Sequence, residues 1–121
     1  MTMTKAHFKT TRESLGLNPR YLAEKIGCHP NILWRIESPL HKAKPSAAAM
    51  SQLQAHAVDF DMAADRIAAA ARKRGHIERP ATVAGFEAMV PELAGWPDRS
   101  HGLFLAEVQR RAHTDIDYTE A

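Results

Sequence analysis

The 121-residue sequence lacks the patterns that mark most enzymes, metalloproteins and membrane proteins. It has one cysteine, so no intramolecular disulfide bond can form, and its seven histidines show no H-E-x-x-H or paired-cysteine spacing. It contains no G-x-S-x-G motif, no glycine-rich phosphate loop and no apolar run near the ~20 residues of a membrane span. We therefore expect no catalytic residues, no metal, no cofactor, no membrane association and a cytoplasmic location.

Charge is distributed unevenly along the chain. Residues 1–46 hold eight Lys or Arg against three Asp or Glu, whereas residues 47–121 hold eight against eleven. The first segment thus has a net charge of +5 and the second −3. A basic surface is typical of proteins that bind the phosphates of nucleic acids, although a small domain can also be basic by chance.

The basic segment predicts three short helices. The first runs from about Lys5 to Leu15 and is closed by Gly16. Asn18-Pro19 starts a second helix that ends at Ile26, because Asn caps the free N–H groups and Pro fits the first helical position. His29-Pro30 starts the third helix in the same way, with a weaker cap, and Ser38-Pro39 ends it.

The spacing of Ala23, Gly27 and Leu33 predicts a helix-turn-helix. Two helices that cross closely need a small side chain at the contact, which Ala23 provides, and the turn between them needs a residue that tolerates positive φ, which Gly27 is. Cys28 falls at an apolar position of the motif, so we expect a buried structural thiol. The residues expected to face the core from the two helices are Leu22 and Ile26, and Leu33 and Ile36.

With Leu33 and Ile36 turned inward, the remaining side chains of the third helix are left to contact bases in the major groove. The predicted base contacts are His29, Asn31, Ile32, Trp34 and Arg35. Trp34 has two interpretations: it stacks on DNA, or it folds back on the loop after Pro39. The predicted phosphate contacts are Arg20, Lys42 and Lys44, and the alternative for each is a merely solvated charge.

The segment from Leu15 to Glu37 resembles the Cro/C1-type (XRE-family) helix-turn-helix, through Leu22-Ala23-Glu24-Lys25-Ile26-Gly27 and Arg35-Ile36-Glu37. The resemblance implies a lambda repressor-like bundle of four or five helices. It also implies a transcriptional regulator, usually a repressor, that binds double-stranded DNA as a homodimer on a near-palindromic operator. In that family an arginine of the first helix often pairs with the glutamate that ends the third. Arg12 and Glu37 occupy those places here.

The second half of the chain also predicts helices. A heptad pattern runs from Met50 to Ala71 between Ser46 and Gly75, and it fits one long helix or two helices that meet near Asp59–Asp61. A short helix follows at residues 82–90, then a last helix capped by Ser100 and ending near Ala112, then a polar, frayed tail at residues 115–121. The predicted class is therefore all-α, with a DNA-binding domain at residues 1–58 and a helical extension at residues 59–121.

Apolar residues of this extension exceed what the basic domain alone needs to cover its core. We therefore expect them to hold a homodimer together, and the residues assigned to that interface are Phe60, Ile67, Phe86, Trp96, Leu103, Phe104 and Val108. The alternative function is an antitoxin or phage adaptor in which residues 76–112 bind a protein partner.

Overall fold

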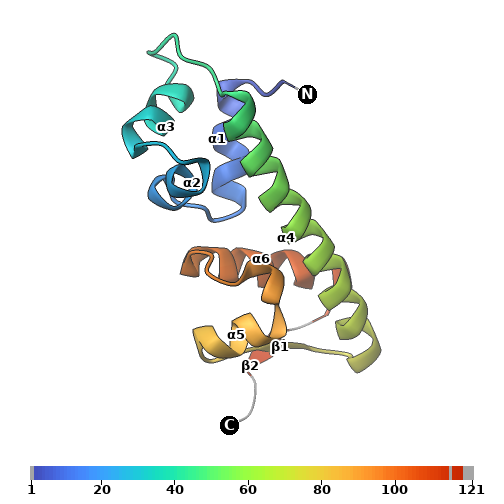
Figure 1. The fold of residues 1–121 in the computed structure, drawn as a ribbon. Helices are drawn as coiled ribbons and strands as arrows, with labels where there is room; N and C mark the ends of the chain where they lie inside the picture. The colour runs from blue at the N-terminus through green and yellow to red at the C-terminus, as the bar shows by residue number, and fades with distance from the viewer. Residues whose placement is uncertain (1, 115, 119–121) are drawn as a thin grey trace. The chain divides into compact units, whose positions relative to one another are not determined.

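The computed structural model describes residues 2–114 and 116–118, which are mainly helical (Figure 1). These residues form six α-helices, one 3-10 turn and two short strands. The chain divides into two compact units, Met1–Ala57 and Val58–Ala121. The prediction of a helical protein is confirmed, with one short pair of strands added.

The first unit contains three short helices, and their bounds confirm the predictions. Each begins after a residue whose side chain accepts a backbone N–H: Thr4 Oγ1 from His7, Asn18 Oδ1 from Tyr21, and His29 Nδ1 from Asn31. Such caps satisfy donors that have no partner inside the helix. The helices are α1 (Lys5–Ser14), α2 (Pro19–Ile26) and α3 (Pro30–Glu37).

The ends of these helices follow from local chemistry. Gly16 and Gly27 have φ of 73° and 87°, the left-handed conformation that glycine adopts without steric cost. Ser38 is extended, as expected for a residue before proline. Cys28 is half-buried, which corrects its predicted place in the core. It comes directly after the left-handed Gly27, at the edge of the turn.

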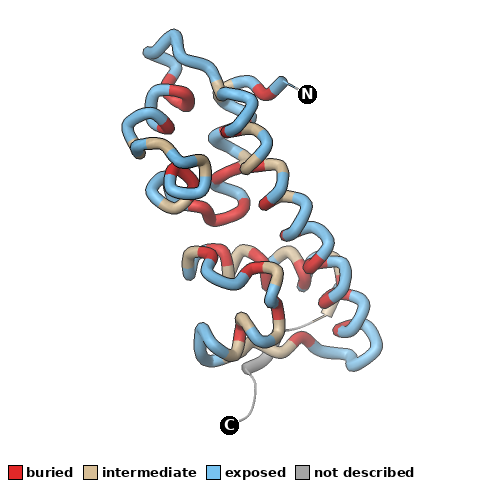
Figure 2. Tube along the Cα trace, viewed as in Figure 1, coloured by how far each residue is buried: buried red, intermediate tan, exposed pale blue. Residues whose placement is uncertain are grey.

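The core of the first unit is mostly aliphatic. In Figure 2 buried positions recur along every helix of this unit, as expected for helices that each cover one apolar stripe. An ion pair, Arg12–Glu37, is buried with them. The buried apolar residues are Met3, Phe8, Leu15, Leu17, Leu22, Ala23, Leu33, Ile36, Ala49 and Leu53.

The heptad segment forms one helix, α4 (Ala47–Arg74), which decides between the two possibilities left open by the sequence. Ser46 Oγ caps it by accepting the N–H of Ala49 at 3.1 Å, and Gly75 follows its end with φ of 81°. Asp59 and Asp61, the candidate caps of a second helix, are exposed positions within α4. The predicted seam is buried at Leu53, Phe60, Ala64, Ile67 and Ala71 and half-buried at Met50 and Ala57.

After α4, the described residues of the second unit form two further helices, a 3-10 turn and two short strands. Thr82 caps α5 by accepting the N–H of Gly85 at 3.0 Å. Strands β1 and β2 pair in parallel, with Ile77 opposite Ile116. The elements are β1 (Ile77–Arg79), α5 (Val83–Met89), the 3-10 turn η1 (Pro91–Leu93), α6 (Asp98–Ala112) and β2 (Ile116–Tyr118).

Two predictions about this unit were wrong. Ser100 does not cap α6, because the helix begins at Asp98 after Pro97 and buries Ser100 in its first turn. The expected frayed tail contains a strand, β2, because its backbone pairs with β1. Residues 115 and 119–121 of that predicted tail lie outside the described residues.

Four aromatic rings form the centre of the second unit. Phe60 lies edge-on to Phe104, with ring centroids 5.4 Å apart, and is stacked on Trp96 at 6.2 Å. Phe86 lies edge-on to the other side of Phe104 at 5.8 Å. Offset and edge-to-face pairs of this kind add stability beyond the area they bury.

This core corrects the assignment of a dimer interface. Phe60, Ile67, Phe86, Trp96, Phe104 and Val108 are buried within one copy of the chain, and Leu103 is half-buried. The six buried residues are therefore covered by other parts of the same copy. We no longer assign these six residues to contacts between two copies, whereas the assignment of Leu103 stays a prediction.

Candidate functional site

The helix α3 presents one buried and one exposed side. Leu33 and Ile36 point into the core of the first unit. Asn31 and Arg35 are exposed, as are the large apolar side chains of Ile32 and Trp34, which expose 43% and 55% of their surface. His29, at the start of the helix, is exposed too. The five side chains predicted to contact bases are thus all exposed, on one helix and its cap.

The turn before α3 sets the helix against α2. The carbonyl of Ala23 accepts the N–H of Gly27 at 2.8 Å and that of Cys28 at 2.9 Å, which ends α2 and turns the chain. Ala23 is fully buried, and its methyl group permits the close approach of α3, which packs on α2 and α1 (Figure 1). Ala23, Gly27 and Leu33, whose spacing predicted the turn, are therefore residues that hold α3 in place.

A buried ion pair fixes the end of α3 to α1. Arg12 Nε donates to Glu37 Oε2 at 2.7 Å, and Arg12 Nη2 donates to Glu37 Oε1 at 2.8 Å. The third nitrogen, Nη1, donates to the carbonyl of Leu17 at 2.8 Å. Two parallel bonds between planar groups restrict both position and orientation. Glu37 is thus a structural residue, as the family resemblance implied.

Lys5 also holds the end of α3, a role that the sequence did not reveal. Its Nζ donates to the carbonyl of Arg35 at 2.9 Å and to that of Ser38 at 2.8 Å. These carbonyls lie at the helix C-terminus, where the last backbone acceptors lack helical partners and a cation is favourable. Lys5 is thirty residues away from Arg35 in the sequence, and no local pattern signals such a contact.

Trp34 contacts the loop that follows α3, yet stays largely exposed. Its ring lies edge-on to His41, with centroids 4.9 Å apart. One of the two interpretations, packing on the loop after Pro39, is therefore observed. About half of the Trp34 side chain is exposed to solvent, which is an unusually large exposed apolar surface for one residue of a small domain. This exposed half is accessible to a binding partner.

The loop between α3 and α4 carries the predicted phosphate contacts. Lys42 and Lys44 are exposed there, and Leu40 beside them exposes 88% of its surface. Arg20, the second residue of α2, is exposed at the start of that helix. Helix starts carry partial positive charge, so a cation at this place is available to an anion outside the protein.

The positive charge of the first unit lies outside its core. The Arg12–Glu37 pair cancels internally, so the net charge of residues 1–46 is carried by the other side chains. The two remaining acidic residues are Glu13 and Glu24, both exposed. The exposed cations of this segment are Lys9, Arg20, Lys25, Arg35, Lys42 and Lys44.

A polar contact links α2 to the first turns of α4. His56 Nδ1 lies 2.8 Å from the carbonyl of Gln52, so it donates there, and Nε2 is left to accept from the hydroxyl of Tyr21 at 3.2 Å. Burial raises the pKa of Tyr21 above its usual value, and the nearby charge of Glu24 raises it further. The phenol thus stays protonated and keeps this hydrogen bond.

No protein-family model matches the sequence, and no curated protein matches it either. Within the described residues, no three His, Cys, Asp or Glu side chains are grouped as metal ligands. In the same part of the chain, no helix combines the length and apolar character that a bilayer crossing requires. The geometry and charge of α3 and its surroundings are therefore the features that indicate a function.

Proposed function

We propose that this protein is a sequence-specific DNA-binding transcription regulator of the Cro/C1 type, in which α2, the turn at Gly27 and α3 act as a helix-turn-helix. The observation that carries the proposal is the exposed side of α3, where Asn31 and Arg35, which have base-reading chemistry, flank the two exposed apolar side chains of Ile32 and Trp34. A second helix docked in the major groove uses such residues to distinguish base pairs.

Each exposed side chain of α3 has a matching group on DNA. Asn31 can form two hydrogen bonds with adenine N6 and N7, and Arg35 can do so with guanine O6 and N7. Ile32 suits the methyl group of thymine, and the open half of Trp34 suits a sugar or another thymine methyl. His29 has its Nδ1 engaged in the helix cap, so only Nε2 is available to a base.

Rigid support of α3 favours this role. The bidentate Arg12–Glu37 pair, the Lys5 contacts and the buried Leu33 and Ile36 hold both the position and the rotation of the helix. A reading surface must hold its donors in register with base edges, so a helix fixed at its end is suited to the task.

The surrounding charge supplies the nonspecific part of binding. Arg20, Lys42 and Lys44 are exposed cations at the start of α2 and in the loop after α3, where phosphates on either side of a groove would lie. Because one helix covers few base pairs, the proposal expects two copies on a near-palindromic site, with α3 helices about one DNA turn apart.

The experiment is selection of bound sites from random duplex DNA with the intact chain, followed by affinity measurement at several salt concentrations. We expect one enriched motif, and affinity that falls steeply as salt rises. Lys42→Ala and Lys44→Ala should weaken binding equally on all sequences and lower the log–log salt slope by about 1 for each lost contact. Lys73→Ala, which removes an exposed cation of α4 in the second unit, is the matched control and should change neither. The absence of an enriched motif would overturn the proposal.

A further inference from the structure

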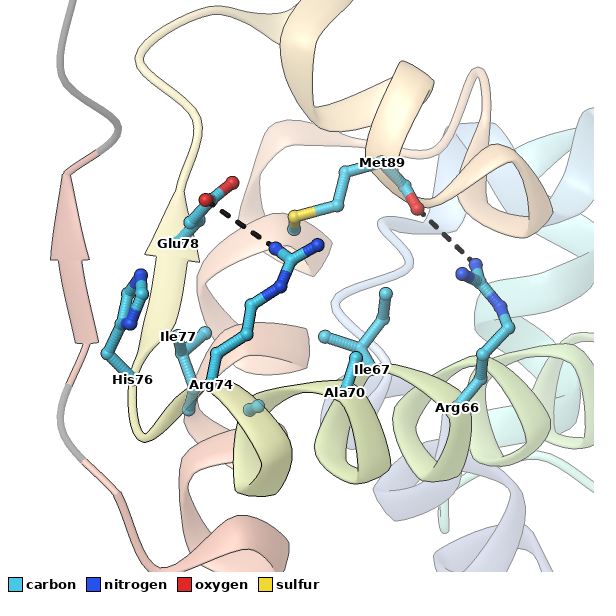
Figure 3. Close-up of a pocket in the computed structure, with 9 residues that line it drawn as sticks. Arg66, Ile67, Ala70, Arg74, His76, Ile77, Glu78 and Met89 are labelled. Atoms are coloured by element: carbon cyan, nitrogen blue, oxygen red, sulfur yellow. Dashed lines mark hydrogen bonds and ion pairs between the residues drawn. The ribbon is translucent and has the colours of Figure 1, made fainter.

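Two small cavities of the second unit are formed by described residues. They differ in whether the charged side chains that line them have partners within the protein. Figure 3 shows the first, with a volume of about 190 Å³. Both of its arginines have partners: Arg74 Nη1 lies 3.5 Å from Glu78 Oε1, and Arg66 Nη2 donates to the carbonyl of Met89 at 3.3 Å and to Glu92 at 2.7 Å. Its charges are therefore already compensated within the protein.

The second cavity has a volume of about 260 Å³ and lies between the end of β1, the start of α5 and the first two turns of α6. Arg79 and Asp98 both line it. Neither side chain has an ion-pair or hydrogen-bond partner among residues 2–114, whose side chains the structure describes. The cavity is thus lined by one cation and one anion that form no ion pair with each other.

An apolar and aromatic wall completes this cavity. Val83 lines it and exposes 49% of its surface, and Phe86 beside it is buried. The imidazole of His101 is stacked on the Phe86 ring, with centroids 3.9 Å apart and planes 15° from parallel. His101 Nε2 is buried and lacks a hydrogen-bond partner among the described residues, which is an energetic cost that a bound polar group would reduce.

We propose that this cavity binds a small zwitterion with an apolar part, the chemistry of a free amino acid. The carboxylate pairs with Arg79, the ammonium group pairs with Asp98, and the apolar portion lies against Val83 and Phe86. Both charges of the ligand meet an unpaired charge of opposite sign, which a neutral or singly charged molecule would not achieve. The volume lies below the ~300–1,000 Å³ of sites for drug-sized molecules, which restricts the ligand to a small one. This inference does not depend on DNA binding.

The test is isothermal titration of the intact chain with L-leucine, L-phenylalanine and 4-aminobutyrate, which differ in apolar part and in charge spacing. The singly charged probes 3-phenylpropionate and 2-phenylethylamine are titrated alongside. We expect at least one zwitterion to bind about tenfold or more tightly than either singly charged probe, because only the zwitterion forms both charge-assisted contacts.

Two variants separate the two contacts. Arg79→Gln should weaken the zwitterion and the acid about tenfold and leave the amine unchanged, and Asp98→Asn should weaken the zwitterion and the amine and leave the acid unchanged. Arg74→Gln, in the other cavity, is the matched control and should alter none of them. Far-UV circular dichroism checks that each variant is folded. If one of the two variants does not fold, the binding measured with the other variant tests the proposal.

Three results would overturn the proposal. The first is no binding of any of the three zwitterions at concentrations up to about 10 mM, tenfold above a weak dissociation constant of about 1 mM. The second is zwitterion affinity that Arg79→Gln and Asp98→Asn leave unchanged. The third is an equal loss in Arg74→Gln, which would indicate a nonspecific charge effect.

Discussion

The two units place their aromatic residues in opposite ways. In the second unit Phe60, Phe86, Trp96 and Phe104 form the core, whereas in the first unit Trp34 stands on the outside of α3. The first unit fills its core with Phe8 and aliphatic side chains instead. The exposed ring is therefore not a residue that the fold of the first unit requires, which is why we associate it with binding.

Ion pairs show the reverse arrangement. The first unit buries Arg12 and Glu37 together, whereas the second keeps its network on the surface around Arg111. Arg111 donates to Asp61 at 2.6 Å, to Asp65 at 2.7 Å and to Glu107 at 3.0 Å, and both aspartates are largely exposed. A buried pair fixes geometry but is costly to break, and exposed pairs contribute little each.

The largest expected effect separates the two tryptophans, one in each unit. Trp96→Ala should lower the free energy of unfolding by about 4 kcal/mol, because it removes a ring that is 7% exposed and stacked on Phe60. Trp34→Ala should lower it by less than about 0.5 kcal/mol, because the lost ring is half exposed. Urea unfolding followed by circular dichroism measures both. Equal losses for the two variants would contradict the distinction between a buried core ring, Trp96, and a largely exposed one, Trp34.

The next effect concerns the buried pair. Arg12→Ala should cost about 3 kcal/mol, because it leaves the Glu37 carboxylate buried without its partner. Replacement of both residues, Arg12→Met with Glu37→Leu, should cost less than Arg12→Ala alone. Arg111→Ala, the surface counterpart, should cost about 1 kcal/mol or less. The comparison fails if Arg111→Ala proves as damaging as Arg12→Ala in the same urea titration.

A smaller effect distinguishes two glycines that both have open space where a Cβ would lie. Gly27→Ala should destabilise by about 1 kcal/mol, since φ of 87° strains any L side chain. Gly102→Ala, within α6, should instead stabilise by about 0.5 kcal/mol, because alanine is the better helix former. Thermal unfolding of the two variants gives the sign of each change. If Gly27→Ala stabilised the protein, the backbone at residue 27 would have to adopt a different φ, and the expected strain would be absent.

The smallest effect is the pH response of the surface network. Hydrogen bonds from Arg110, reinforced by Arg111 and opposed by burial, lower the pKa of Glu107 to about 2. A carboxylate whose pKa is lower in the folded state stabilises the protein above about pH 4.5, its value when unfolded, and this contribution is lost as the pH falls toward 2.

The Glu107→Gln variant measures that contribution. Relative to the unmodified protein it should lose up to about 1 kcal/mol at neutral pH, and the difference should shrink toward zero near pH 2. Glu13→Gln, which removes an exposed carboxylate with no ion pair among the described residues, serves as the control and should show a smaller difference. A difference for Glu107→Gln that grows as the pH falls would have the wrong sign.

Features of the fold that depend on neighbouring residues were predictable from the sequence. Asn18-Pro19, His29-Pro30 and Ser38-Pro39 mark the bounds of α2 and α3, because capping and the restriction before proline act within a few residues. The exposed side of α3 followed from the spacing of Leu33 and Ile36.

Features that depend on distant residues were not predictable. The number of apolar residues can be read from the sequence, but which of them pack together cannot. Core residues of the second unit were therefore assigned to a dimer interface. The contact of Lys5 with the end of α3 and the pairing of β1 with β2 join segments about thirty to forty residues apart. Arg79 and Asp98 likewise meet at one cavity only through the fold.

The central claim, that α3 reads DNA bases, is tested most directly by the affinity of Arg35→Ala for the selected site and for its single base-pair variants. We expect this substitution to cost about 1–3 kcal/mol on the selected site and to remove the preference at one base pair while the other preferences persist. An equal loss on every sequence would show that Arg35 contacts only phosphates, and it would contradict the claim.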